Sequence, residues 1–139
     1  CLDLKPDLIS IMIGINDCWR RYDSNMPMPV EMFEANYREI LKETKERLDA
    51  EIVLCEPFVL PVLEGQENWY EDLGPKIQVV RKLAREFNAL LIPYDGIFAK
   101  AATVQKPAYW LFDGVHPTEA GHALIAREWL KHVFNIEHL

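Results

Sequence analysis

Residues 8–14, with the sequence LISIMIG, form a short and almost continuous apolar run that follows Pro6 and Asp7 and ends in a glycine. An apolar run of this length, without regular alternation of polar residues, is typical of a strand that is buried on both faces of a sheet. Two later segments share this character: residues 51–56, EIVLCE, and residues 89–93, ALLIP. The sequence therefore predicts three strands, and the first of them is expected to be an inner strand.

Amphipathic segments separate these apolar runs. Three segments have apolar residues at helical spacing: 30–48, 75–88 and 118–134. A weaker helical pattern covers 97–104, and the polar segments 14–29 and 107–115 are predicted to be loops. Alternation of strand and helix is typical of a layered α/β domain with parallel strands and right-handed crossovers. Because the sequence has no internal repeat and no stretch with the composition of a linker, we expect 1–139 to be one domain or part of one.

The bulk composition narrows the class of protein. The 139 residues are 50% hydrophobic and 27% charged, which is typical of a globular domain. The formal net charge is -7, so we expect no nucleic acid partner, because an acidic surface repels phosphate. No apolar run reaches the roughly 18 residues that a membrane span needs, so no membrane is expected. The three cysteines lack CxxC spacing, which predicts neither a disulfide framework nor a zinc site and favours a cytoplasmic location.

A second informative stretch is residues 111–122, LFDGVHPTEAGH. Asp113 precedes His116 by three residues on a segment that Gly114 allows to turn and Pro117 stiffens. A histidine that acts as a base needs an acid to orient its ring and to stabilise the imidazolium, so this pair fits those two roles. The alternative is structural: Asp113 caps a turn, and His116 stands on the surface where a helix begins.

Asn16 follows the first predicted strand, directly behind Gly14 and Ile15. An asparagine amide at this place can donate a hydrogen bond to an oxyanion that develops during a reaction. An Asx turn is the alternative, since Asn-Asp after a strand is also common turn chemistry. Ligands of parallel sheets bind beyond the carboxyl ends of the strands, so the topology allows Asn16 and the Asp113–His116 loop to meet at one site.

Residues 14–17, GIND, and residues 113–116, DGVH, together resemble two sequence blocks of the SGNH (GDSL-type) hydrolases, and the resemblance covers essentially the whole chain. It implies a flavodoxin-like three-layer α/β/α sandwich around a parallel sheet. It also implies serine-type ester hydrolysis through an acyl-enzyme, with His116 as the base, Asp113 as its orienting acid and Asn16 in the oxyanion hole. Neither a cofactor nor a metal is implied.

The chain departs from the family pattern at the nucleophile. The family's serine and oxyanion glycine lie in blocks before GxND, and here only CLDLKP precedes the first apolar segment. Ser10 lies within an apolar run, and Ser24 lacks the glycine–aspartate context; Cys18 is an alternative nucleophile. We expect 1–139 to be the C-terminal part of one SGNH hydrolase domain, inactive alone, with its N-terminal strands and nucleophile upstream. That segment, or another copy in a homo-oligomer, would cover the bare edge of the first strand.

Residues beside the two blocks indicate which class of ester could be the substrate. Trp19 and Arg20 follow GIND, and Trp110 precedes Asp113; aromatic faces can stack on sugar rings, and an arginine can hydrogen-bond hydroxyl groups. Both regions resemble the bacterial carbohydrate esterases that deacetylate xylan or its oligosaccharides, so the predicted substrate is a small acetylated carbohydrate. The alternatives are a lysophospholipase or arylesterase of the same fold, or a noncatalytic sugar-binding or assembly domain. Trp19 could instead pack its loop or form a subunit contact.

Overall fold

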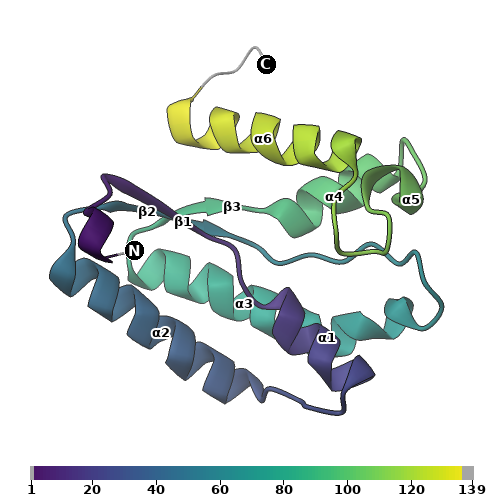
Figure 1. The fold of residues 1–139 in the computed structure, drawn as a ribbon, viewed down its shortest axis with the longest axis horizontal. Coiled ribbons are helices and arrows are strands. Elements are labelled where there is room, and N and C mark those ends of the chain that lie inside the picture. Colours follow the sequence, from purple (N-terminus) through teal and green to yellow (C-terminus); the bar gives the residue numbers. More distant parts are fainter. Residues whose placement is uncertain (1, 136–139) are drawn as a thin grey trace.

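The computed structural model describes residues 2–135, and Figure 1 shows how its elements are arranged. The strands in chain order are β1 (Leu8–Ile11), β2 (Glu51–Cys55) and β3 (Leu90–Ile92). They form a parallel sheet in the order β1-β2-β3, with Ile9 opposite Ile52 and Leu54 opposite Leu91. The strands and their parallel arrangement confirm the prediction from the apolar runs.

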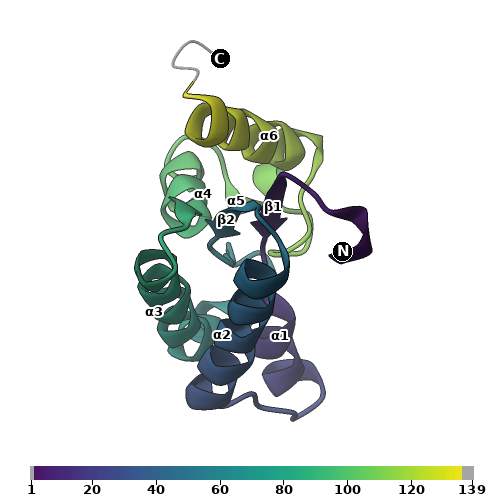
Figure 2. The ribbon, with the colours of Figure 1, turned by 90° about the vertical axis from the view of Figure 1, so that its left-hand side faces the viewer.

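Helices connect the strands and cover both faces of the sheet. Their bounds in chain order are α1 (Ile15–Asp23), α2 (Val30–Arg47), α3 (Tyr70–Glu86), α4 (Tyr94–Ala102), α5 (Pro107–Trp110) and α6 (Glu119–Phe134). Two short 3-10 helices, η1 (Leu2–Leu4) and η2 (Gln66–Trp69), precede β1 and α3. In Figure 2, α4 and α6 lie on one side of the sheet, and α1, α2 and α3 lie on the other. The predicted three-layer α/β/α fold is confirmed.

Side chains of strand β2 pack in both layers of the core. Ile52 and Leu54 pack against α2 and α3, whereas Val53 and Cys55 pack with residues of β3, α4 and α6. All four side chains are buried. Successive side chains of a strand point to opposite faces, so a strand that is covered on both faces needs apolar residues at every position.

Among the described residues, strand β1 has the bare edge that the sequence predicts for it within this chain. It pairs with β2 on one side, and within residues 2–135 its other edge has no strand beside it, so its side chains are only partly buried. On one face of β1, the Ser10 hydroxyl accepts a hydrogen bond from the indole N–H of Trp129 in α6 at 2.8 Å. On the other face, a groove of about 700 Å³ lies between β1 and α2, and Ile9, Ile11 and Ile13 line it.

Residues 14–29, which the sequence predicts as a loop, contain helix α1. Gly14 caps the start of α1 with a φ of 123°, and its carbonyl accepts a hydrogen bond from the N–H of Cys18 at 3.1 Å. A Cβ at Gly14 would lie 3.2 Å from both the Phe33 and the Pro57 side chains, so glycine is the residue that fits here. Packing against η2 and α3 stabilises this short polar helix, and such tertiary packing is not visible in its own residue pattern.

Other helix boundaries differ from the prediction for local reasons. α3 starts at Tyr70 rather than at Pro75, because η2 leads directly into it. The predicted loop 107–115 contains the single-turn helix α5. Thr118 caps α6 as predicted, and its hydroxyl accepts a hydrogen bond from the N–H of Gly121 at 3.2 Å. None of the helices in the described part of the chain is both long and apolar enough to cross a membrane.

Candidate active site

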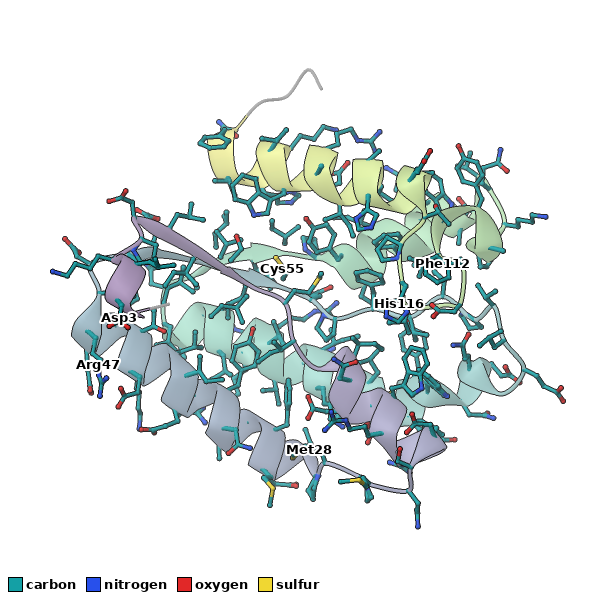
Figure 3. The ribbon with its side chains drawn as sticks, in the orientation of Figure 1. Asp3, Met28, Arg47, Cys55, Phe112 and His116 are labelled. Atoms are coloured by element: carbon teal, nitrogen blue, oxygen red, sulfur yellow. The ribbon has the colours of Figure 1, made fainter. Side chains whose placement is uncertain are left out.

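The loop that carries Asp113 and His116 lies between α5 and α6, beyond the carboxyl ends of the strands (Figure 3). The loop closes on itself, because the N–H of Phe112 donates to the carbonyl of His116 at 3.1 Å. Asp113 Oδ1 accepts hydrogen bonds from the N–H of Val115 at 3.0 Å and from the N–H of His116 at 2.7 Å. The other oxygen, Oδ2, lies 2.6 Å from Nδ1 of the imidazole. One carboxylate therefore both caps the turn and orients the ring.

Hydrogen bonding holds Asp113 in its anionic form. Burial alone would raise the pKa of this carboxyl. The main-chain N–H and the imidazole of His116 and the N–H of Val115 donate hydrogen bonds to the carboxylate, and these bonds lower the pKa. The net pKa lies below its ordinary value. The carboxylate fixes Nδ1 as the ring nitrogen that faces it. The His116 side chain is 59% exposed, so Nε2, on the far side of the ring, is open to a reacting group.

Two aromatic rings flank the imidazole of His116. The Trp19 ring comes from α1, with its centroid 5.7 Å from that of the imidazole and a tilt of 58°. The Phe112 ring lies nearly parallel to the imidazole, at 5.7 Å and 15° (Figure 3). Asn16 and Arg20 are exposed, and Asn16 precedes Trp19 by three residues, which places both on one face of α1. The structure thus brings α1 to the same region as His116 through Trp19.

Contacts elsewhere on α1 fix it to η2 and to the start of α3. The Tyr22 ring stacks on the Trp69 ring at 5.3 Å and 9°, and its hydroxyl donates to the carbonyl of Asn68 at 2.9 Å. Arg21 pairs with Asp72 of α3 at 3.1 Å. These contacts determine where the α1 residues stand relative to the imidazole.

Asp72→Ala is expected to lower the free energy of unfolding by about 3–5 kcal/mol, because it leaves a buried lysine without its counter-charge. Lys76, one turn later on α3, is 1% exposed and pairs with Asp72. Urea denaturation followed by circular dichroism measures the change. Glu71→Ala removes a neighbouring exposed carboxylate and is expected to change the stability by less than about 0.5 kcal/mol. Equal effects of the two substitutions would contradict this prediction.

The structure does not place the Trp110 side chain beside His116. Its indole N–H donates to the carbonyl of Ala101 in α4 at 3.1 Å, and its ring packs against the core layer between the sheet and α6. Phe112, which is 61% exposed, lies beside the His116 ring instead, and the sequence analysis missed it. No pattern in the sequence indicates it; in the structure Leu111 is extended and fully buried, so the side chain of the residue after it points outward.

The hydroxyl and thiol groups near the two blocks are engaged elsewhere. Ser10 accepts a hydrogen bond from Trp129, and Ser24 donates to Asp23 at 2.5 Å. Cys18 is fully buried, and this burial, together with the nearby carboxylate on α3, raises the pKa of its thiol to about 12. Cys18 is therefore a poor nucleophile. In the part of the chain that is described, no group of three His, Cys, Asp or Glu side chains that could hold a metal ion comes together.

The fold and the two blocks define a three-layer α/β/α domain with an acid–histidine pair beyond the carboxyl ends of its strands. The model of the GDSL-like Lipase/Acylhydrolase family matches residues 1–124. The chain belongs to this family.

Relatives at moderate identity include a curated protein and several solved structures. An acetylxylan esterase of Geobacillus stearothermophilus is 35% identical over 133 residues, which are 93% of this chain and 60% of that protein. A structure from Parabacteroides merdae, described as a GDSL-like lipase, has a TM-score of 0.91 at 37% identity and covers 96% of this chain and 63% of its own. This chain therefore spans about 60% of the length of these relatives.

Solved structures of the Geobacillus stearothermophilus acetylxylan esterase include three described as catalytic mutants. They have TM-scores of 0.83 to 0.84 at 33–34% identity and cover 94% of this chain and 61% of their own. The mutants replace a serine, an aspartate and a histidine, and the aspartate and histidine are three positions apart in that protein.

Proposed function

We propose that this chain is the part of a serine-type carboxylic ester hydrolase that supplies the base, its orienting acid and an oxyanion donor. The observation that carries the proposal is the 2.6 Å contact between Asp113 Oδ2 and His116 Nδ1, in a ring whose other nitrogen is open. The spacing of the catalytic aspartate and histidine in the related acetylxylan esterase, also three positions, supports these roles. Asn16, on the helix that contacts His116 through Trp19, is the proposed oxyanion donor.

In the proposed reaction, Nε2 of His116 removes the proton of a serine hydroxyl while that oxygen attacks the ester carbonyl. Asp113 stabilises the imidazolium that forms, and the Asn16 amide donates to the negatively charged oxygen of the tetrahedral intermediate. The imidazolium then protonates the alcohol oxygen that leaves, and an acyl-enzyme remains. The same imidazole activates a water molecule, which hydrolyses the acyl-enzyme to the carboxylic acid and restores the serine.

The proposal places the serine in a part of the polypeptide outside these 139 residues. Ser10 and Ser24 have other hydrogen-bond partners, and the longer acetylxylan esterase has a catalytic mutant at a serine. The free edge of β1, beside the groove that Ile9, Ile11 and Ile13 line, offers a place for an additional strand. The upstream segment, or a second copy in a homo-oligomer, would bury this edge, and the chain alone is expected to be inactive.

The proposed substrate is a carbohydrate that carries acetyl or other short acyl groups, such as an acetylated xylo-oligosaccharide. Trp19 and Phe112 present aromatic rings beside His116, and such rings stack on sugars. Arg20 on α1 is exposed and can donate to hydroxyl groups. The description of the 35% identical relative as an acetylxylan esterase supports the same substrate class.

A cytoplasmic location is proposed from the cysteines. Cys18 and Cys55 are buried free thiols, which suit a reducing compartment. Cys1 lies outside the described residues.

The test is a comparison of kcat/KM for the polypeptide that carries this chain on three esters: acetylated xylo-oligosaccharide, a lysophospholipid and an aryl ester. We expect the highest kcat/KM, with release of acetate, on the acetylated xylo-oligosaccharide. A higher value on the lysophospholipid or the aryl ester would replace the carbohydrate substrate with that class. Binding of the oligosaccharide without hydrolysis of any ester would overturn the enzymatic proposal in favour of a noncatalytic sugar-binding domain.

A further inference from the structure

The loop that carries Asp113 is bound to one buried amide from a distant part of the chain. Gln66, in η2, is 2% exposed. Its Oε1 accepts hydrogen bonds from the main-chain N–H groups of Val62 and Leu63, both at 2.9 Å. Its Nε2 donates to the main-chain carbonyl of Asp113 at 2.8 Å, across a sequence separation of 47 residues. This side chain therefore connects the segment that follows β2 to the candidate catalytic loop.

The partners of Gln66 determine the orientation of its amide. Two N–H donors converge on one end, and a carbonyl oxygen faces the other, so only one of the two amide orientations satisfies all three bonds. An amide with its oxygen and nitrogen both bonded in the interior is a rigid connection, because moving it would leave a buried polar group without a partner.

Gly114 allows this amide to lie directly against the loop. Its φ is +90°, and a Cβ at this position would lie 2.3 Å from Oε1 of Gln66. The carbonyl of Gly114 accepts a hydrogen bond from the N–H of Leu60 at 3.0 Å. The segment after β2 thus binds the main chain of both Asp113 and Gly114, immediately before His116.

We infer that Gln66 is a positioning residue that sets the geometry of the Asp113–His116 pair through the carbonyl of Asp113. The inference rests on the proposed function, in which this pair is the orienting acid and the base. The Asp113 carboxylate makes its contacts with Val115 and His116 at 2.6 to 3.0 Å, and rotation of the Asp113 main chain would displace all of them together. Gln66 donates to that main chain rather than to the carboxylate or the imidazole, so it acts on the pair only through the main chain.

Two substitutions in the polypeptide that carries this chain test the inference. Gln66→Glu keeps the shape but replaces the donor that faces the Asp113 carbonyl with a second acceptor, and Gln66→Met keeps the volume without hydrogen bonds. We expect kcat to fall about 10- to 100-fold with KM changed less than about twofold, because a small displacement of a catalytic group slows the chemical step. The imidazole ¹⁵N chemical shifts of His116 report its tautomer, and we expect them to move from a Nδ1–H ring toward a mixture of tautomers.

Glu67→Gln, at the exposed neighbouring position in η2, is the matched control and is expected to change neither kcat nor the ¹⁵N shifts. Wild-type ¹⁵N shifts and kcat in folded Gln66→Glu protein, below its melting temperature, would overturn the inference, even if that protein melted earlier. If Gln66→Met does not fold, the isosteric Gln66→Glu decides. If the wild-type protein hydrolyses no ester, the proposed function fails, and the ¹⁵N shifts still decide whether Gln66 positions the pair.

Discussion

Replacing His116 with alanine in the polypeptide that carries this chain is expected to lower kcat by about 10⁴-fold or more on an acetylated xylo-oligosaccharide. In the proposed reaction, the substitution removes the group that takes the proton from the nucleophile and later transfers it to the leaving alcohol. Because the His116 side chain is 59% exposed, the fold is expected to remain intact. Initial rates of acetate release, with circular dichroism to verify folding, measure this effect.

His122→Ala provides the control for this substitution. His122 is an exposed histidine, the fourth residue of α6, beyond the Asp113–His116 loop, and its replacement is expected to leave kcat within about twofold of the wild type. A His116→Ala protein that retained more than a tenth of the wild-type turnover would show that another group is the base.

The second large effect is expected at Asn16. Asn16→Ala should lower kcat by roughly 10²–10³-fold, or about 3–4 kcal/mol of transition-state stabilisation, with a smaller effect on KM. The reason is that an oxyanion donor binds the charge that develops in the transition state more strongly than it binds the neutral carbonyl of the substrate. Steady-state kinetics on the acetylated xylo-oligosaccharide separate kcat from KM.

Asn68→Ala is the matched control for Asn16→Ala, because Asn68 contributes only its main-chain carbonyl to the contact with Tyr22. We expect it to leave both kinetic constants near their wild-type values. If Asn16→Ala instead raised KM and left kcat unchanged, Asn16 would contact the substrate equally in the ground state and the transition state, and the oxyanion role would be refuted.

The strands and their alternation with helices were predictable from local patterns. The run EIVLCE predicts β2 because a strand that is covered on both faces needs continuous apolar residues, and Val53 and Leu54 do pack on opposite faces. Helix α1 was not predictable in the same way. Its residues are mostly polar, and it depends on packing against η2 and α3, which lie about 50 residues further along the chain.

The side chains proposed to face the substrate were the hardest part of the site to predict from the sequence. The proximity of a tryptophan to Asp113 suggested Trp110, but its indole is bonded to Ala101 in α4, and Phe112 occupies the place beside His116. Adjacent positions in a loop differ in which way they point, and the backbone conformation of each residue determines this direction. Composition and spacing do not contain that information.

By itself the sequence predicted where the three strands lie along the chain and that Asp113 is close enough to reach His116, since both depend on residues that are neighbours along the chain. Apolar continuity over a few residues predicts each strand, and a separation of three residues suffices for Asp113 to reach Nδ1 of His116. Only the tertiary structure decided that α1 contacts the imidazole through Trp19 and that Gln66 binds the main chain of the Asp113–His116 loop. Those contacts join segments far apart in sequence, and they form only when the helix layers pack against the sheet.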